Sequence, residues 1–353
     1  MNAPQTFVVG TGRCGSTLLS HIIRSHEDLL SVSELWSFTT DLGMRIERAF
    51  PPGEVGGSQF WGILATPQPR QSMLLAHDLQ MEEVIYPLET GRFEADEVPP
   101  ILQAMLPHLE GADPDVLFDE MAACVQTWGP AKVGVHYDRL FSMLARHLNK
   151  SQWVERSGGS LRVVERLMAT FPEAKFVHLV RDGRDTALSM SRHIGFRMAI
   201  LCGMQAEELG TDPYESNDRS DEGDLSDELA QTLPELFSRQ AFAEFDLPPS
   251  FCGHYWSGEI VAGLEALAKL PHESLLTMRY EDLLDDPSTA VKQLGQFIDC
   301  EVSDDWVAKA AAMVRKTSPR WTELADAQLV DLHQACLPGF EALEQHGLAW
   351  SDQ

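Results

Sequence analysis

The sequence predicts an α/β fold: a parallel sheet flanked by helices, with a mostly helical insertion. Residues 7–19 and 176–191 predict it, because each stretch runs from apolar residues through a glycine turn into a helical pattern. Strands that alternate with helices are typical of parallel sheets, whose strands are buried on both faces and therefore apolar throughout. With 44% hydrophobic residues, the chain can also bury a large core.

The N-terminal elements come first along the chain. Apolar residues predict a strand over residues 6–10, and a helix follows the glycine turn over about residues 15–26. A second short extended run covers residues 29–32. The first strand therefore leads directly into a glycine turn and a helix, which makes the predicted sheet P-loop-like.

A long stretch of different character follows, from about residue 37 to residue 150. Proline and glycine interrupt residues 51–70, whereas apolar residues recur at helical spacing over residues 101–109 and 116–149. We therefore predict a mostly helical insertion between the first two strands and the rest of the sheet.

Regular α/β order resumes after this insertion. The pattern predicts strands over residues 152–154 and 175–180, a helix over residues 159–171 that ends before Pro172, and a further helix from Thr186 onward. These elements are expected to extend the sheet that the N-terminal strand begins.

The segment from about residue 205 to residue 246 is predicted to be an acidic loop or lid. Its first part, residues 205–228, combines many Asp and Glu residues with Gly, Pro, Ser and Asn, which is typical of solvated chain. An ordinary surface loop is the alternative to a lid.

The last predicted elements belong to the same α/β unit. Residues 250–267 have a helical pattern, residues 274–278 form a short apolar strand, and a helix covers about residues 288–298. The sequence RYEDLL at residues 279–284 connects the strand to the last of these helices.

The first glycine turn nearly matches the phosphate-binding motif GxxxxGK[ST]. Gly10, Gly15 and Thr17 occupy their motif positions, but Ser16 stands where the lysine is expected. In nucleotide triphosphatases that lysine reaches the β and γ phosphates, and the hydroxyl after it holds Mg²⁺. A loop without the lysine is expected to bind a phosphate that lacks a γ group. Arg13 offers its guanidinium inside the turn, with a surface ion pair as the alternative.

The second glycine turn contains Arg181, Gly183 and Ser189. Arg181 ends a predicted strand and Ser189 lies in the helix that follows, so both side chains can reach one phosphate at the carboxyl edge of the sheet. The alternative is a helix capped by Asp182 with arginines that face solvent. Because this corner and the first turn must meet at one ligand, we predict a single domain over residues 1–353.

Composition argues against several classes of function. The net charge of −27 disfavours nucleic acid and anionic membranes as partners, although it is compatible with a local basic pocket. The six cysteines show neither CxxC nor Cys/His ligand spacing, which argues against a zinc site and a disulfide framework. Neither a transmembrane run nor a secretory signal is visible, so we expect a cytoplasmic protein.

Four motifs resemble those of sulfotransferases that use 3′-phosphoadenosine 5′-phosphosulfate (PAPS), above all the branch of tyrosylprotein sulfotransferases and their bacterial relatives. The sequence GRCGSTL at residues 12–18 is similar to the family's 5′-phosphosulfate signature PRSGTTL, and residues 181–189 match its 3′-phosphate signature RDGRxxxxS. The RYEDLL run and the sequence SPRWTEL at residues 318–324 are similar too. The resemblance covers about residues 1–36, 152–193 and 250–350.

The resemblance implies PAPS as the sulfuryl donor and no metal, and it explains the missing lysine, because this donor has no β and γ phosphates. Backbone N–H groups at the start of the first helix would hold the 5′ phosphosulfate, with the hydroxyls of Ser16 and Thr17 as further donors. The implied donor-binding residues are Arg13, Cys14, Gly15, Ser16, Thr17, Leu18, Arg181, Ser189, Tyr280 and Arg320.

Glu34, Arg13 and Arg156 are expected to carry the chemistry. Sulfuryl transfer to an alcohol or phenol calls for a general base, and the resemblance implies Glu34, because the family has a glutamate at the same distance from the loop arginine. Arg13 would neutralise charge on the leaving group. For Glu34 the alternative is helix capping or a structural pair with an arginine, and His26 and His178 are weaker candidates for the base.

Arg156 marks a departure from the family pattern. Relatives carry a lysine about 25 residues before the 3′-phosphate arginine, and this chain reads WVERSGGS there, with Arg156 in place of the lysine. Arginine keeps the positive charge but does not donate a proton near neutral pH, so we expect an electrostatic clamp. A structural salt bridge to Glu155 or Glu165 is the alternative.

Two other functions stay open at this stage. A P-loop kinase or NTPase would need the lysine that Ser16 replaces and an acidic Mg²⁺ ligand, for which the chain offers only Asp182 at a strand end. A catalytically inactive PAPS-binding protein is the second alternative. The acceptor also stays open among small-molecule, lipid and peptide hydroxyls, with the acidic balance favouring a neutral or cationic one. A homodimer is compatible with the sequence.

Overall fold

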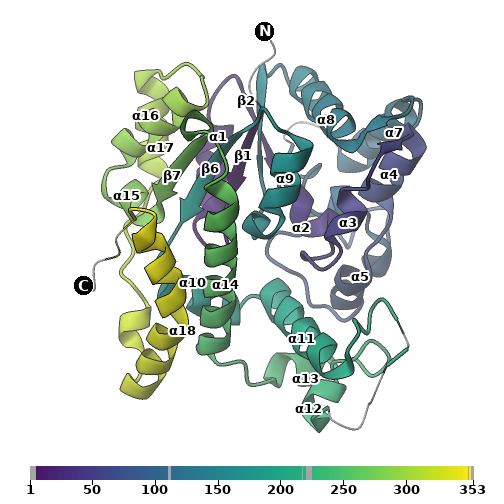
Figure 1. The fold of residues 1–353 in the computed structure, drawn as a ribbon. Coiled ribbons are helices and arrows are strands. Elements are labelled where there is room, and N and C mark those ends of the chain that lie inside the picture. The colour runs from purple at the N-terminus through teal and green to yellow at the C-terminus, as the bar shows by residue number, and fades with distance from the viewer. Residues whose placement is uncertain (1–4, 110–112, 217, 220–224, 349, 351–353) are drawn as a thin grey trace.

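The computed structural model describes residues 5–109, 113–216, 218–219, 225–348 and 350. Its centre is a five-stranded parallel sheet with the order β2-β5-β1-β6-β7 (Figure 1). The strands are β1 (Thr6–Val9), β2 (Leu29–Ser33), β5 (Gln152–Arg156), β6 (Lys175–Val180) and β7 (Leu275–Arg279). Helices flank this sheet, so the predicted α/β fold class is confirmed.

β1 lies in the middle of the sheet, between β5 and β6. β2 pairs with the far side of β5, so the chain leaves β1 in one direction and later returns to form β6 on the other side. The carboxyl ends of β1, β5 and β6 therefore lie next to one another. In open parallel sheets, the carboxyl edge at such a reversal of strand order is where ligands bind.

Successive residues of β1 face two different apolar layers. Val8 joins a cluster with α1, α16 and α17, whereas Phe7 and Val9 join a larger cluster that includes α14 and the insertion. Because both faces are covered, the central strands are apolar throughout. The helices are α1 (Ser16–Arg24), α14 (Pro249–Leu267), α16 (Pro287–Phe297) and α17 (Asp304–Met313).

The insertion is mostly helical, as predicted, and lies on the side of the molecule opposite α16 and α17 (Figure 1). The helical pattern at residues 101–109 yields a shorter helix than predicted, and the one at residues 116–149 is divided into α7 and α8, because Gly129 and Pro130 interrupt it. A two-stranded antiparallel sheet, β3 (Glu54–Val55) with β4 (Ala131–Lys132), was not predicted. The helices are α2 (Leu35–Thr39), α3 (Ile46–Ala49), α4 (Gly57–Ala65), α5 (Pro69–Ala76), α6 (Pro100–Gln103), α7 (Pro114–Val125) and α8 (Val133–His147).

The acidic segment at about residues 205–246 is more ordered than the solvated loop that its composition predicts. Its first residues belong to α11 (Ile194–Leu209), and α12 (Asp227–Ala230) and α13 (Arg239–Glu244) follow. The fully buried Arg70 forms ion pairs with Asp212 and Asp41, and this contact attaches the segment to the insertion. Residues 217 and 220–224 of the predicted loop lie outside the described residues.

The remaining helices cover the corner after β6 and the C-terminal side. α10 (Gly183–Ser191) begins three residues before the predicted start at Thr186, because Asp182 caps it by accepting a hydrogen bond from the N–H of Arg184. α9 (Val164–Thr170), preceded by a 3₁₀ turn, replaces the single helix predicted over residues 159–171. α15 (Tyr280–Asp285), α17 and the long α18 (Asp326–Gln345), which packs against α14, were not predicted.

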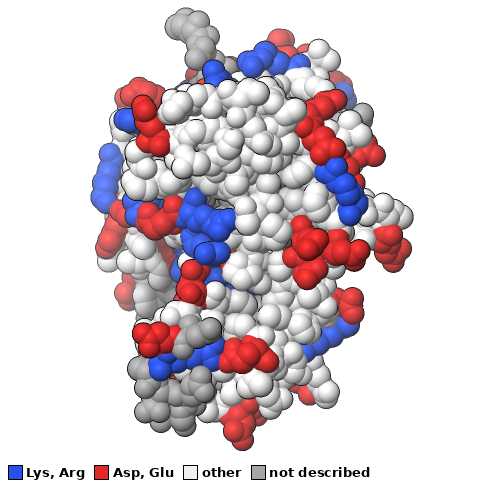
Figure 2. All heavy atoms as spheres, turned by 90° about the vertical axis from the view of Figure 1, so that its right-hand side faces the viewer, with Lys and Arg blue, Asp and Glu red and all other residues white. Residues whose placement is uncertain are grey.

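The surface carries both signs of charge. On the face shown in Figure 2, Lys and Arg side chains lie in small groups beside Asp and Glu, separated by wide uncharged areas. The guanidinium of Arg92, for example, pairs with the carboxylate of Asp119 at 2.8 Å. Of the helices that the structure describes, none is both long and apolar enough to cross a membrane.

Candidate active site

The loop between β1 and α1 has an unusual backbone that opens the start of the helix. Gly12, Arg13 and Gly15 adopt left-handed conformations, with φ angles of 79°, 54° and 91°. A Cβ atom on Gly15 would lie 2.2 Å from the ring of Tyr280, so only glycine fits there. Because Gly15 is the N-cap and provides no side chain, the N–H groups of the first turn of α1 have no capping acceptor. These groups and the helix dipole make a site for an anion.

The loop and the corner after β6 meet, as the sequence predicted. Arg181 donates from Nη1 to the carbonyl oxygen of Arg13 at 3.1 Å and from Nη2 to Asp185 at 3.3 Å. Its guanidinium also lies 5.1 Å from the centre of the Tyr280 ring. Arg13 donates from Nε to the hydroxyl of Ser189 at 3.0 Å. Two motifs far apart in the sequence therefore form one basic corner.

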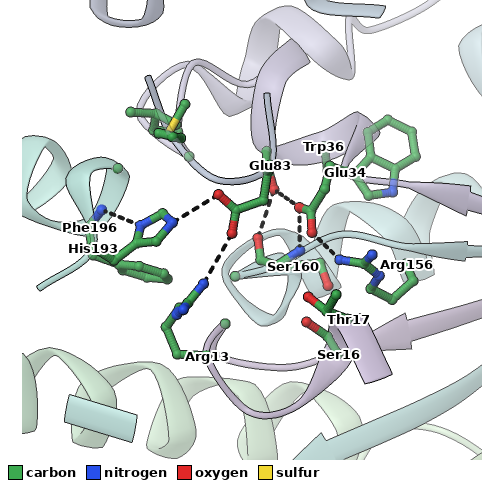
Figure 3. Close-up of a pocket in the computed structure, with 18 of the residues that line it drawn as sticks. Arg13, Ser16, Thr17, Glu34, Trp36, Glu83, Arg156, Ser160, His193 and Phe196 are labelled. Carbon is green, nitrogen blue, oxygen red and sulfur yellow. Dashed lines mark hydrogen bonds and ion pairs between the residues drawn. The ribbon is translucent and has the colours of Figure 1, made fainter. Parts of the chain in front are cut away.

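A cavity of about 450 Å³ opens above this corner (Figure 3). Most of the residues predicted to form the site line it. They come from the loop and α1, from the ends of β2, β5 and β6, from α10, and from the segment after β7: Arg13, Gly15, Ser16, Thr17, Leu18, Glu34, Arg156, Arg181, Ser189 and Tyr280. In the part of the chain that the structure describes, no three His, Cys, Asp or Glu side chains are grouped so as to hold a metal ion.

Cys14 and Arg320 do not line the cavity. The Cys14 side chain is buried beneath the loop, and burial raises the pKa of its thiol, so only its backbone faces the ligand side. Arg320 has an exposed side chain, and its backbone N–H donates to Asp185 at 2.8 Å. A direct contact of the Arg320 side chain with the ligand stays a prediction.

Glu34 and Arg156 form a buried ion pair at the edge of the cavity (Figure 3). Glu34 adopts a left-handed conformation with a φ of 59° at the start of α2. Its Oε2 accepts hydrogen bonds from the hydroxyl of Ser37 at 2.7 Å and from the N–H of Gly158 at 2.8 Å, and its Oε1 accepts from Arg156. A carboxylate oxygen can accept two hydrogen bonds, so Oε1 retains a lone pair.

Two alternatives raised by the sequence are resolved by this pair. Glu34 does pair with an arginine, but the pair lies in the cavity wall and contributes to the site. Arg156 bonds neither Glu155 nor Glu165: the Glu165 carboxylate pairs with Lys269 at 2.9 Å. The Nε of Arg156 is buried without a partner among the described residues.

Five acidic or basic residues that the sequence did not single out also line the cavity: Glu82, Glu83, His108, Arg162 and His193. Glu83 accepts from Nη1 of Arg13 at 3.2 Å and bonds Nε2 of His193 at 2.9 Å, and Glu82 accepts from Nη2 of Arg13 at 3.4 Å (Figure 3). His193 accepts the N–H of Phe196 at its Nδ1, which leaves the proton on Nε2 to be donated to Glu83. Burial alone would raise the pKa of Glu83, but His193 and Arg13 together lower it to about 2.

These residues gave different signals in the sequence. Glu82 and Glu83 lie in the irregular part of the insertion, where no motif marks them. His193 follows Ser189 by one helical turn, and this spacing could have placed it near the 3′-phosphate corner.

The two histidines considered as weaker candidates for the base do not reach the cavity. His26 bonds the carbonyl oxygen of Glu301 at 2.8 Å and accepts the N–H of Asp28 at 3.0 Å. His178 is fully buried in β6, and neither ring nitrogen has a hydrogen-bond partner among the described residues. Burial lowers its pKa to about 4. Both side chains are therefore structural.

The cavity wall farther from the loop is largely apolar. Trp36, Phe38 and Leu42 line it from α2 and the following turn, whereas the Phe196 ring packs on the loop itself, 2.5 Å from where a Cβ atom of Gly12 would lie. The site thus has a basic, hydrogen-bonding end and an apolar end.

Two known protein families match this chain in sequence. Residues 4–215 match the family described as "Sulfotransferase family", and residues 135–329 match the one described as "Sulfotransferase domain". Among curated proteins, no sequence matches this chain significantly.

Similar solved structures include the sulfotransferase domain from the curacin biosynthetic pathway, at 15% identity over 99% of this chain and 100% of that chain, with a TM-score of 0.49. The sulfotransferase domain from the Synechococcus PCC 7002 olefin synthase is similar at 14% identity over 99% and 98%, with a TM-score of 0.48. A sulfotransferase from Alicyclobacillus acidocaldarius is similar at 15% identity over 99% and 98%, with a TM-score of 0.44. At these identities and scores, neither donor nor acceptor is inferred from them.

Proposed function

The chain belongs to the sulfotransferase family, and from this premise we propose that it moves a sulfuryl group from PAPS to the hydroxyl of an alcohol or phenol. The observation that carries the proposal is the meeting of the β1–α1 loop with Arg181 and Ser189 at one cavity. A donor with separate 5′ and 3′ anions suits two anion-binding corners at one site. The missing lysine at Ser16 agrees with a donor that lacks β and γ phosphates.

The residues present fit this donor on three counts. The uncapped N–H groups at the start of α1 suit the 5′ phosphosulfate. The left-handed conformations of Gly12, Arg13 and Gly15 form a turn of the kind whose backbone N–H groups can bind an anion. Arg181 and Ser189 offer charge-assisted and hydroxyl hydrogen bonds to the 3′ phosphate.

Glu34 is proposed as the general base. The acceptor oxygen would attack sulfur, forming a new S–O bond while the S–O bond to the 5′ phosphate breaks and its electrons leave with 3′-phosphoadenosine 5′-phosphate (PAP). The proton of the hydroxyl would pass to Glu34, whose Oε1 has a free lone pair beside the cavity. The bonds from Ser37 and Gly158 hold the other oxygen and so orient the carboxylate.

Arg156 and Arg13 are proposed to stabilise the charge that develops during transfer. A guanidinium does not give up its proton near neutral pH, so both act through charge and hydrogen bonds. Arg156 is held by Glu34 in the cavity wall, which preorganises its positive charge beside the reacting group.

The acceptor is proposed to carry its hydroxyl on an apolar or aromatic body. Trp36, Phe38 and Leu42 line the cavity away from the loop, and such walls favour apolar ligands over sugars. Assays with a phenol, a long-chain alcohol and a sugar would test this class, and preference for the sugar would contradict it.

A kinase function is disfavoured by the position of the only candidate Mg²⁺ ligand that the sequence suggested. Asp182 caps α10, pairs with Arg184 at 2.7 Å and accepts from the indole of Trp350 at 3.1 Å, and it does not line the cavity. The discriminating experiment is a thermal-shift titration with PAP compared with ATP and Mg²⁺, followed by sulfate transfer from PAPS to a test phenol. Stabilisation by ATP and Mg²⁺ but not by PAP would overturn the proposal, and PAP binding without transfer would indicate an inactive binding protein.

A further inference from the structure

The segment that follows α5 carries two carboxylates into the basic corner. Glu82 and Glu83 occupy Nη2 and Nη1 of Arg13, at 3.4 Å and 3.2 Å, while Ser189 occupies its Nε at 3.0 Å. Every nitrogen of this guanidinium therefore already has a protein partner. The arginine expected to contact the donor is engaged by an anion from the insertion.

On the basis of the proposed function, we infer that Glu82 and Glu83 are an internal anion that competes with PAPS and PAP for Arg13 and so lowers the affinity for the donor. A donor with three acidic groups and the two carboxylates cannot share one small basic corner without strong repulsion. Binding must therefore move the carboxylates away from Arg13.

The two carboxylates are suited to this role in different ways. Glu82 is exposed, with 80% of its side chain accessible, so its pair with Arg13 is weak and easily exchanged. Glu83 is less accessible, at 21%, and is held in place by His193. His193 is itself fixed as the N-cap of α11, so Glu83 has a rigid second partner and can leave Arg13 without becoming unpaired.

The cost of displacing the carboxylates falls on every ligand that uses Arg13. A ligand with both phosphates gains contacts with Arg13, Arg181 and the start of α1. Together these contacts can offset the loss of the ion pairs between Arg13 and the two carboxylates. A ligand that lacks the 3′ phosphate gains less and displaces the carboxylates poorly. The same competition favours release of PAP after transfer, because the carboxylates can return to Arg13.

The test is a calorimetric titration of PAP into the wild-type protein, Glu83→Gln and the double variant Glu82→Gln/Glu83→Gln. Glutamine keeps the shape and removes the charge, so we expect the double variant to bind PAP about tenfold more tightly. Glu89→Gln is the matched control: Glu89 is exposed on the same segment, outside the cavity lining, and its change is expected to alter the dissociation constant less than twofold. Titration with adenosine 5′-phosphosulfate should show a gain in the double variant no larger than that of PAP, because a ligand that displaces the carboxylates poorly incurs less of the displacement cost in the wild type.

Hydrogen exchange on the unmodified protein provides a second measurement. Addition of PAP should speed exchange over residues 79–86, because the contacts with Arg13 are lost, and unchanged exchange there would overturn the inference. PAP affinity in the double variant equal to that of the Glu89→Gln control would also overturn it, while leaving the donor assignment intact. Failure of PAP to bind any of the four proteins would overturn the proposed function and the competition with it.

Discussion

Replacement of Arg181 by alanine should weaken PAP binding strongly, because this side chain is the proposed contact to the 3′ phosphate. Its guanidinium is mostly buried, with 19% of the side chain accessible, and lies between Asp185 and the Tyr280 ring. Charge-assisted hydrogen bonds contribute more than neutral ones, and two to one phosphate, partly screened by solvent, give about 3 kcal/mol. This corresponds to a dissociation constant raised roughly 100-fold.

The assay is calorimetric titration of PAP, with two variants that separate charge from geometry. Arg181→Lys keeps the charge and loses the planar fork, so its affinity should lie between those of the wild type and Arg181→Ala. Arg239→Ala is the control, since it removes the same charge from an exposed pair with Asp78 outside the cavity.

The variant should remain folded, because Asp185 keeps its bonds from the N–H groups of Arg320 and Trp321. A dissociation constant for Arg181→Ala within threefold of the Arg239→Ala value would refute the 3′-phosphate assignment.

Three further changes test other parts of the structure. Glu34→Gln should lower kcat by at least about 100-fold while PAP affinity stays within about threefold, since a general base acts on the transfer and not on donor binding; equal losses in kcat and affinity in a phenol-sulfation assay would contradict that role. His178→Leu should flatten the dependence of unfolding free energy on pH. Burial holds the pKa of His178 in the folded protein at about 4, below the ordinary value of 6.5. The unfolding free energy of the wild type should therefore fall by about 3 kcal/mol from this group as pH falls from 7 to 4, whereas the variant lacks this loss. Urea denaturation at both pH values measures this, and parallel losses in the two proteins would count against it. Arg70→Met should destabilise the fold by about 3 kcal/mol or more, because it leaves the fully buried Asp41 without its 2.8 Å partner, while PAP affinity per folded molecule is unchanged; a melting temperature equal to that of wild type would exclude this structural role.

The sheet and its two anion-binding corners could be predicted because their signals are local. Strands buried on both faces appear as continuous apolar runs, and the glycine turns follow them directly, so β1, β6 and the loop at Gly15 were located within a few residues. Even the meeting of the first loop with the corner of Arg181 and Ser189 followed from the motifs, since the carboxyl ends of adjacent parallel strands share an edge.

The insertion could not be predicted to the same depth, because its contacts with the site depend on tertiary packing. Glu83 reaches Arg13 from 70 positions away in the chain, and nothing in its neighbours marks it as a site residue. The acidic segment shows the same limit. Its composition is typical of solvated chain, but one buried arginine, Arg70, anchors Asp212 and with it the start of the segment.

The net charge of the chain and the charge of the proposed donor are compatible because they act over different distances. A net charge of −27 repels an anion at long range, yet salt screens charges that lie farther apart than about 8 Å at physiological ionic strength. Within the cavity, Arg13, Arg156 and Arg181 and the start of α1 act at contact distance, where screening is weak. Two of these three arginines pair with carboxylates of the cavity wall, Arg13 with Glu83 and Arg156 with Glu34. The Arg156 partner is proposed to accept a proton during transfer and the Arg13 partner to yield to the donor, so the acidic residues of the site regulate the same arginines that bind the anion.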